Sequence, residues 1–118
     1  AAVTTPMLDI DGLEAPTVTP KAEAAWHLYT VKLDPTRFTC TRDQFIDALK
    51  AEGVPTAVHY PRATVDQPAL AEWNKHDTPI SSGLSQRVFS LPMHHALTDE
   101  HFEIIGAALN KVASAYRA

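Results

Sequence analysis

The chain has little cysteine, no excess of positive charge and no long apolar run, and each shortage excludes a class of protein. Cys40 is the single cysteine, so no internal disulfide is possible and a reducing, cytoplasmic setting is expected. The 10 basic residues are outnumbered by 14 acidic ones, which gives no electrostatic reason to expect nucleic acid as a partner. No apolar run approaches the roughly 20 residues of a membrane span, so no membrane partner is expected.

The length and composition predict one folded domain preceded by an extended N-terminal segment. The 118 residues are 45% hydrophobic, which is enough for one core. Residues 1–23 contain three prolines and one glycine without a sustained period of 2 or 3.6, which predicts an extended linker. Leu8, Ile10 and Leu13 would attach this linker to a domain formed by residues 24–118.

Two helices are predicted from their capping signals. Thr41 and Gln44 have the spacing of a capping box, and Gly53 supplies a left-handed end. Thr98 would cap a last helix that has two acidic residues in its first turn, where the helix dipole favours negative charge. The expected apolar stripes of the two helices are Phe45, Ile46 and Leu49, and Phe102, Ile105, Leu109, Val112 and Tyr116.

Three strands are predicted, at residues 24–33, 55–60 and 89–93. The first is apolar on both faces, as in a central strand, and the second has proline at both ends, which favours a short or edge strand. Two short helices are expected, over Pro68–Asn74 and from Thr78 onward. In the second, Ile80, Leu84 and Val88 recur at intervals of four, which predicts one apolar helical face. The order β-α-β-(α)-α-β-α with about three strands suits a two-layer α+β domain.

The candidate binding residues are His59, Tyr60 and Arg62, which fall within four consecutive positions after the second predicted strand. Polar loop residues on a rigid scaffold often bind ligands, and a guanidinium can hold a phosphate or a carboxylate in a bidentate manner. Two alternatives remain open: His59 could bond a neighbouring backbone group at the strand end, and Arg62 could be a solvated surface arginine.

Metal binding and nucleophilic catalysis are not expected. The adjacent His94 and His95 would point to opposite faces of a strand, and Cys40 has no partner cysteine, so no zinc ligand set is recognisable. Cys40 precedes the cap of a helix, but no general base accompanies it. His27 is expected in the core, and Trp73 in the core or at a domain interface.

A series of short motifs points to one family. In chain order they are Trp26-His27-Leu28-Tyr29, His59-Tyr60-Pro61, Gln67-Pro68, Ser90-Leu91-Pro92-Met93-His94 and Leu97-Thr98-Asp99-Glu100. In content and spacing the series resembles the carboxy-terminal small domain of the DegT/StrS family of pyridoxal-phosphate-dependent sugar aminotransferases. The resemblance extends from about Trp26 to Val112.

The resemblance implies a small, mainly antiparallel sheet covered by helices and attached to a large domain that holds pyridoxal phosphate. It implies amino transfer to a keto-sugar on a nucleotide carrier, by a homodimer with active sites at the subunit boundary. In that setting this domain closes one side of the cleft, and His59, Tyr60 and Arg62 are expected to contact the sugar substrate.

The family also implies what this chain lacks. The Schiff-base lysine, the aspartate that pairs with the pyridine nitrogen and the phosphate-binding loop belong to the large domain. The lysines of this chain are scattered on linker, strand, helix and loop, so we expect no cofactor site, no catalytic residue and no transamination by this chain alone. Family members often have a proline and a second histidine where Ala63 and Val65 stand, which puts the substrate contacts of this loop in question.

Two readings of the whole chain follow. In the first, it is an excised or naturally separate small domain of such an enzyme, since it begins at Ala1 without a methionine. The alternative is a stand-alone, non-catalytic binding module that retains the scaffold. An excised domain would expose an apolar surface, with Tyr29, Val31, Tyr60 and Met93 as expected contributors.

Overall fold

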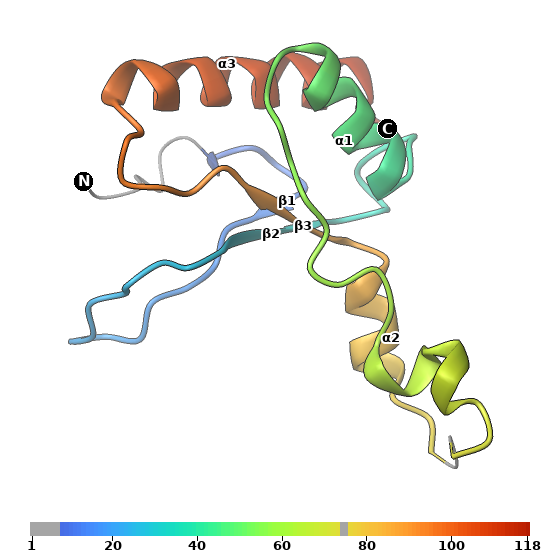
Figure 1. The fold of residues 1–118 in the computed structure, drawn as a ribbon. Helices are drawn as coiled ribbons and strands as arrows, with labels where there is room; N and C mark the ends of the chain where they lie inside the picture. Colours follow the sequence, from blue (N-terminus) through green and yellow to red (C-terminus); the bar gives the residue numbers. More distant parts are fainter. Residues whose placement is uncertain (1–7, 74–75) are drawn as a thin grey trace.

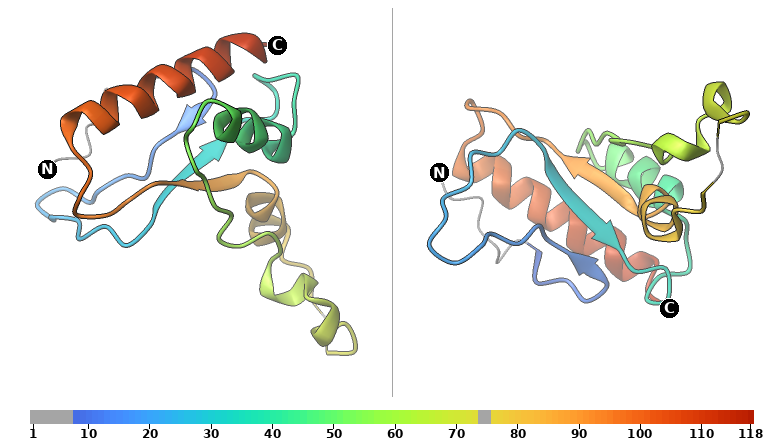
Figure 2. Two further views of the ribbon diagram at one scale, coloured as in Figure 1. Left: turned by 45° about the horizontal axis from the view of Figure 1, so that its top comes forward. Right: turned by 90° about the horizontal axis from the view of Figure 1, so that it is seen from below.

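The computed structural model describes residues 8–73 and 76–118. Its centre is a three-stranded antiparallel sheet in the order β1-β2-β3, and two helices cover one face of that sheet (Figures 1 and 2). The strands are β1 (Leu13–Glu14), β2 (Tyr29–Leu33) and β3 (Val88–Leu91), and the covering helices are α1 (Arg42–Ala51) and α3 (Asp99–Ala115). This arrangement confirms the α+β class with one small antiparallel sheet.

The register of the sheet decides which side chains enter the core. Val31 of β2 faces Phe89 of β3, and the next pair along the strands is Thr30 and Ser90. Because side chains alternate along a strand, Val31 and Phe89 point toward the covering helices, and Thr30 and Ser90 point to the other face. That other face carries the candidate site described below.

The core lies between the sheet and the two covering helices. The capping box predicted at Thr41 forms, and Thr98 caps the last helix as predicted, in a box completed by His101. All members of the two expected stripes except Phe102 contribute to the core or pack against it. The ring of Phe45 lies 5.4 Å from that of Phe38 and 5.7 Å from that of Phe89. The longest helix, α3, has 17 residues, and no helix in the described ranges is long and apolar enough to cross a bilayer.

The strand predictions were partly wrong. The first predicted strand is only Tyr29–Leu33, and His27 lies outside it with an exposed side chain. Residues 55–60 form no strand: they make a single bridge, in which Ala57 exchanges two backbone hydrogen bonds with Ser90. Flanking prolines cannot donate to a ladder, which limits the pairing to this one position.

The third strand of the sheet comes instead from the expected linker. Leu8, Ile10 and Leu13 are buried in the core, and β1 pairs with β2 so that Glu14 faces Lys32 and forms an ion pair with it. This strand was not predicted, because two residues are too few to show an alternating pattern.

Residues 61–73 and 76–87 form an arm that projects from the body of the molecule (Figure 1). The Cα radius of gyration is 15.5 Å, against about 13 Å for a compact domain of this length. The arm contains two 3₁₀ helices, η2 (Thr64–Asp66) and η3 (Pro68–Leu70), and the helix α2 (Pro79–Ser85). The helix predicted over Pro68–Asn74 is therefore one 3₁₀ turn, and Asn74 lies outside the described residues.

The arm exposes apolar side chains that were expected to be covered. Trp73 and Ile80 are each 78% exposed, so Ile80 does not join the predicted apolar face of α2. Of the expected contributors to an exposed apolar surface, Tyr60 is exposed and Met93 is half-buried. The other two, Tyr29 and Val31, are buried in the core, and for them the expectation was wrong.

A buried arginine attaches the arm to the body. The Arg42 side chain is 6% exposed, and its Nη1 donates to the carbonyl of Ser85 at 3.0 Å and to that of Val88 at 2.7 Å. These carbonyls belong to the end of α2 and the start of β3. The Nε of Arg42 donates to Asp43 at 2.5 Å, so the guanidinium is neutralised locally. One side chain at the start of α1 thereby orients the junction between arm and sheet.

Replacing Gly12 with alanine is expected to destabilise the fold by about 2–4 kcal/mol. Gly12 has φ +89°, where a Cβ is strained, and that Cβ would lie 2.6 Å from the Phe38 ring and 2.7 Å from the Arg37 Cβ. Denaturant unfolding measures the effect. The control is Gly83→Ala: Gly83 lies inside α2 with open space around it, and alanine should gain up to about 1 kcal/mol there. Equal stability of the two variants would contradict this prediction.

Replacing Arg42 with methionine is expected to cost about 2–4 kcal/mol, because two carbonyls at the arm junction lose their donor. Backbone amides of α2 should also exchange with deuterium faster than in the parent chain. The control Asp43→Asn keeps both carbonyl contacts and changes a 74% exposed side chain, so it should cost less than about 1 kcal/mol. Unchanged exchange in α2 of Arg42→Met would show that Arg42 does not hold the arm.

Candidate functional site

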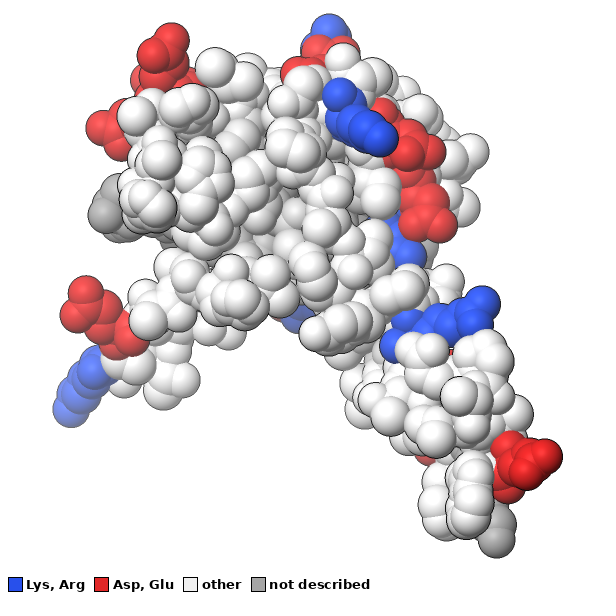
Figure 3. All heavy atoms as spheres, in the orientation of Figure 1, with Lys and Arg blue, Asp and Glu red and all other residues white. Residues whose placement is uncertain are grey.

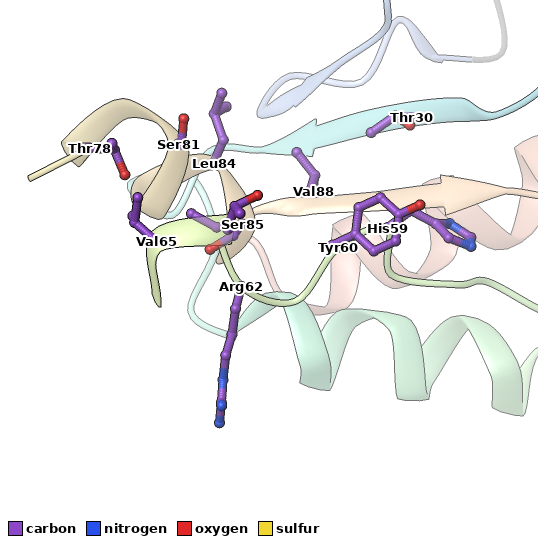
Figure 4. Close-up of a pocket in the computed structure, with 12 residues that line it drawn as sticks. Thr30, His59, Tyr60, Arg62, Val65, Thr78, Ser81, Leu84, Ser85 and Val88 are labelled. Atoms are coloured by element: carbon purple, nitrogen blue, oxygen red, sulfur yellow. The ribbon is translucent and has the colours of Figure 1, made fainter. Parts of the chain in front are cut away.

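An open pocket of about 430 Å³ lies between the root of the arm and the sheet (Figure 4). The three residues predicted to bind substrate all contribute to its lining. The remaining lining comes from the sheet (Thr30, Val88), from the start of the arm (Ala63, Thr64, Val65) and from α2 or its cap (Thr78, Ser81, Leu84, Ser85). Residues distant in sequence thus meet where the arm folds back onto β3.

The side chain of Ser90, on strand β3, holds the imidazole of His59. Its Nδ1 lies 3.3 Å from the Oγ of Ser90, which in turn lies 3.3 Å from the Oγ1 of Thr30. Ser90 is only 3% exposed, and its backbone is bonded to Ala57, two residues before His59. The imidazole is half-buried, and its Nε2 bonds no residue that the structure describes. This contact differs from the bond to a backbone group that was the alternative for His59.

Tyr60 stands at the mouth of the pocket. Its side chain is 71% exposed, and its ring packs edge-on against the His59 imidazole at 5.9 Å and 90°. The peptide bond between the two residues is cis. The Tyr60 hydroxyl makes no hydrogen bond within the described chain, so it is available to a ligand.

Arg62 lines the pocket with the base of its side chain only. In Figure 4 its guanidinium points away from the other labelled residues. The side chain is exposed and forms no ion pair with any described residue. Figure 3 shows positive charge at the root of the arm, beside a body face whose atoms are mostly uncharged. Arg62 can therefore meet an anion outside the pocket, whereas His59 and Tyr60 can meet a polar ligand within it.

The hydroxyl groups of the pocket were missed in the sequence. Thr78, Ser81 and Ser85 have spacings of three and four residues, which place them on one face of a helix. That spacing was a usable signal, but α2 was assigned an apolar face from Ile80, Leu84 and Val88. Val88 in fact belongs to β3, where it lines the pocket from the sheet side.

Two positions at which the family resemblance leads us to expect a proline and a histidine both lie in this pocket. Ala63 and Val65 are half-buried lining residues. Val65 presents an isopropyl group to the pocket, which can form no hydrogen bond, and His59 is the one imidazole of the lining.

A second pocket, of about 590 Å³, is larger but lacks all three predicted binding residues. Its lining includes Cys40, Arg42 and Arg87. Burial raises the pKa of the Cys40 thiol, which disfavours the thiolate that a nucleophile requires. Within residues 8–73 and 76–118, no three histidine, cysteine, aspartate or glutamate side chains gather as metal ligands would.

The lining of the candidate pocket does not fit a pyridoxal phosphate site. Such a site needs a lysine at the cofactor, and none of the lysines in the described ranges lines the pocket. Lys32 pairs with Glu14, and Lys111 pairs with Glu52 at 2.7 Å on the surface. The pocket can hold a polar ligand through hydroxyls, an imidazole and a phenol, but it offers no group that could carry the cofactor covalently.

Relatives of known activity share both the sequence and the fold. The chain is 38% identical over 98 residues to the UDP-2-acetamido-2-deoxy-3-oxo-D-glucuronate aminotransferase of Pseudomonas aeruginosa, covering 83% of this chain and 25% of that protein. It is 30% identical over 99 residues to the dTDP-3-amino-3,6-dideoxy-alpha-D-galactopyranose transaminase of Aneurinibacillus thermoaerophilus, covering 84% and 26%. The chain thus spans about a quarter of the length of the curated relatives it matches.

The structure is similar to that of DesV from S. venezuelae, solved in complex with a ketimine intermediate. The TM-score is 0.78 at 26% identity, over 91% of this chain and 28% of DesV. The sequence matches the family model of the DegT/DnrJ/EryC1/StrS aminotransferases over residues 1–110, which is nearly its full length. The chain therefore belongs to the DegT/DnrJ/EryC1/StrS aminotransferase family.

Proposed function

We propose that the chain is the carboxy-terminal small domain of an aminotransferase that acts on a nucleotide-linked keto-sugar. In this role it closes one side of the active-site cleft, and His59, Tyr60 and Arg62 contact the substrate. The observation that carries the proposal is the pocket itself, because three residues selected from the sequence line one cavity beside a row of hydroxyl groups. The two relatives named above act on UDP- and dTDP-linked sugars, which supports this substrate class.

The chemistry of the site suits both parts of a sugar nucleotide, the sugar ring and the phosphates. Hydroxyls, the His59 Nε2 and the Tyr60 hydroxyl match the alternating donors and acceptors of a sugar ring. The guanidinium of Arg62, which points out of the pocket, would bind the phosphates that follow the sugar. Substrate held in this way would be oriented by the small domain, with its reacting carbon directed toward groups supplied by the rest of the enzyme.

The large domain of the enzyme completes this site in our proposal. It holds pyridoxal phosphate, which supplies the amino-group chemistry, together with the lysine that binds it. The exposed apolar side chains Tyr60, Trp73 and Ile80 are the surface that this domain would cover, within a homodimer of the whole enzyme.

The proposal predicts that UDP-N-acetylglucosamine, used as a probe, binds the 118-residue chain at the smaller pocket. Titration of the ¹⁵N-labelled chain should shift amide resonances of residues 59–65 and 78–85. Replacing Arg62 with methionine should weaken binding about tenfold or more at low salt, because a charge-assisted contact to phosphate is lost. His59→Gln should weaken binding by a smaller factor.

Matched controls come from outside the pocket. His27 is an exposed histidine and Arg37 an exposed arginine, neither of which lines the pocket, so His27→Gln and Arg37→Met should bind the probe as the parent chain does. Shifts centred on residues 40–43 and 86–87 would place the ligand in the larger pocket and overturn the assignment. Equal loss of binding in Arg62→Met and Arg37→Met would reduce the interaction to general electrostatic attraction.

A further inference from the structure

Two hydroxyl groups of the sheet connect to the imidazole of His59. The Ser90 Oγ lies 3.3 Å from the His59 Nδ1 and 3.3 Å from the Thr30 Oγ1. Thr30 and Ser90 are directly opposite partners in the register of β2 and β3, so both side chains rise from the same face of the sheet. The position of each hydroxyl is therefore set by the sheet rather than by a flexible loop.

The rest of the surroundings also restrict the ring. Ser90 is 3% exposed, and the two backbone hydrogen bonds between Ser90 and Ala57 anchor the segment that carries His59. On its other side the imidazole meets the Tyr60 ring edge-on. His59 is thus held at its Nδ1 and packed by Tyr60, while its Nε2 bonds nothing in the described chain.

The number of hydrogens decides the direction of the hydrogen bonds. Ser90 has one hydroxyl hydrogen and two neighbours, so it donates to one and accepts from the other. If Thr30 donates to Ser90 and Ser90 donates to the Nδ1 of His59, both hydroxyl hydrogens are used. In the reverse order the Thr30 hydrogen finds no acceptor among the residues that the structure describes. Thr30 is half-buried, and satisfied hydrogen bonds at such a group favour the first order.

We propose that Ser90 and Thr30 are positioning residues that hold neutral His59 with its proton on Nε2. His59 then presents a fixed hydrogen-bond donor to the ligand, and the group it selects is an oxygen acceptor, such as a sugar hydroxyl, a carbonyl or a phosphate oxygen. This role toward substrate rests on the proposed function. The tautomer itself is a property of the chain alone and can be measured without a ligand.

Long-range ¹H–¹⁵N spectra of the imidazole resonances test the proposal on the ¹⁵N-labelled 118-residue chain at a pH where His59 is neutral. The expected result is one tautomer, protonated at Nε2. In Ser90→Ala the Nδ1 loses its donor, and both ring nitrogen shifts should move toward the average of two exchanging tautomers. Thr30→Val should move them in the same direction by a smaller amount, and Thr30→Ser, which keeps the hydroxyl, should restore the parent spectrum.

The control Ser81→Ala removes a pocket hydroxyl that does not reach His59, so the ring nitrogen shifts should stay in place. If Ser90→Ala does not fold, the comparison of Thr30→Val with Thr30→Ser still decides the test. A proton on Nδ1 in the parent chain, or ring shifts unaffected by Thr30→Val and Ser90→Ala alike, would overturn the proposal. If the tautomer is as expected but UDP-N-acetylglucosamine leaves the Nε2 resonance unmoved, the substrate role of His59 is wrong. The positioning of His59 by the hydrogen bonds from Thr30 through Ser90 would still hold.

Discussion

The buried guanidinium of Arg42 is the contact on which the candidate site depends. Its two hydrogen bonds, to the carbonyls of Ser85 and Val88, join the first turn of α1 to the point where the arm returns to the sheet. Both of those residues line the pocket, so the geometry of the site follows from a side chain that does not touch it. A buried charge is costly unless it is well bonded, and here Asp43 and two carbonyls fulfil that condition.

The arm and the sheet supply different parts of the site. The sheet contributes Thr30 and Ser90, whose hydroxyls set the imidazole of His59, and the arm contributes the helical row of hydroxyls and the stem of Arg62. Such a lining can recognise and orient a polar ligand, but none of the described lysines contributes to it. In the proposed function this lining is a substrate-contacting wall whose reaction partners lie elsewhere in the enzyme, and the family membership supports that proposal.

Local signals in the sequence were sufficient for the helices and insufficient for the sheet. The capping boxes at Thr41 and Thr98 act within four residues, and both helices begin where they were predicted. β1 forms because residues 13–14 reach the free edge of β2, whereas residues 55–60 pair with β3 at Ala57 alone. Both outcomes depend on which distant backbones meet, and no local pattern encodes that. The membership of His59, Tyr60 and Arg62 in one pocket could be anticipated because they are adjacent in sequence. The hydrogen bond between His59 and Ser90 could not be anticipated, because it depends on the strand register.

The central claim is that this chain contacts substrate while the covalent chemistry is carried out by groups outside it. Incubation of the 118-residue chain with pyridoxal phosphate, followed by borohydride reduction and intact-mass measurement, tests that claim most directly. The account predicts no stoichiometric adduct, because none of the lysines in the described ranges lines the pocket and two of them are paired with glutamates. A one-to-one adduct on a single lysine, with the absorbance of a bound cofactor before reduction, would contradict it.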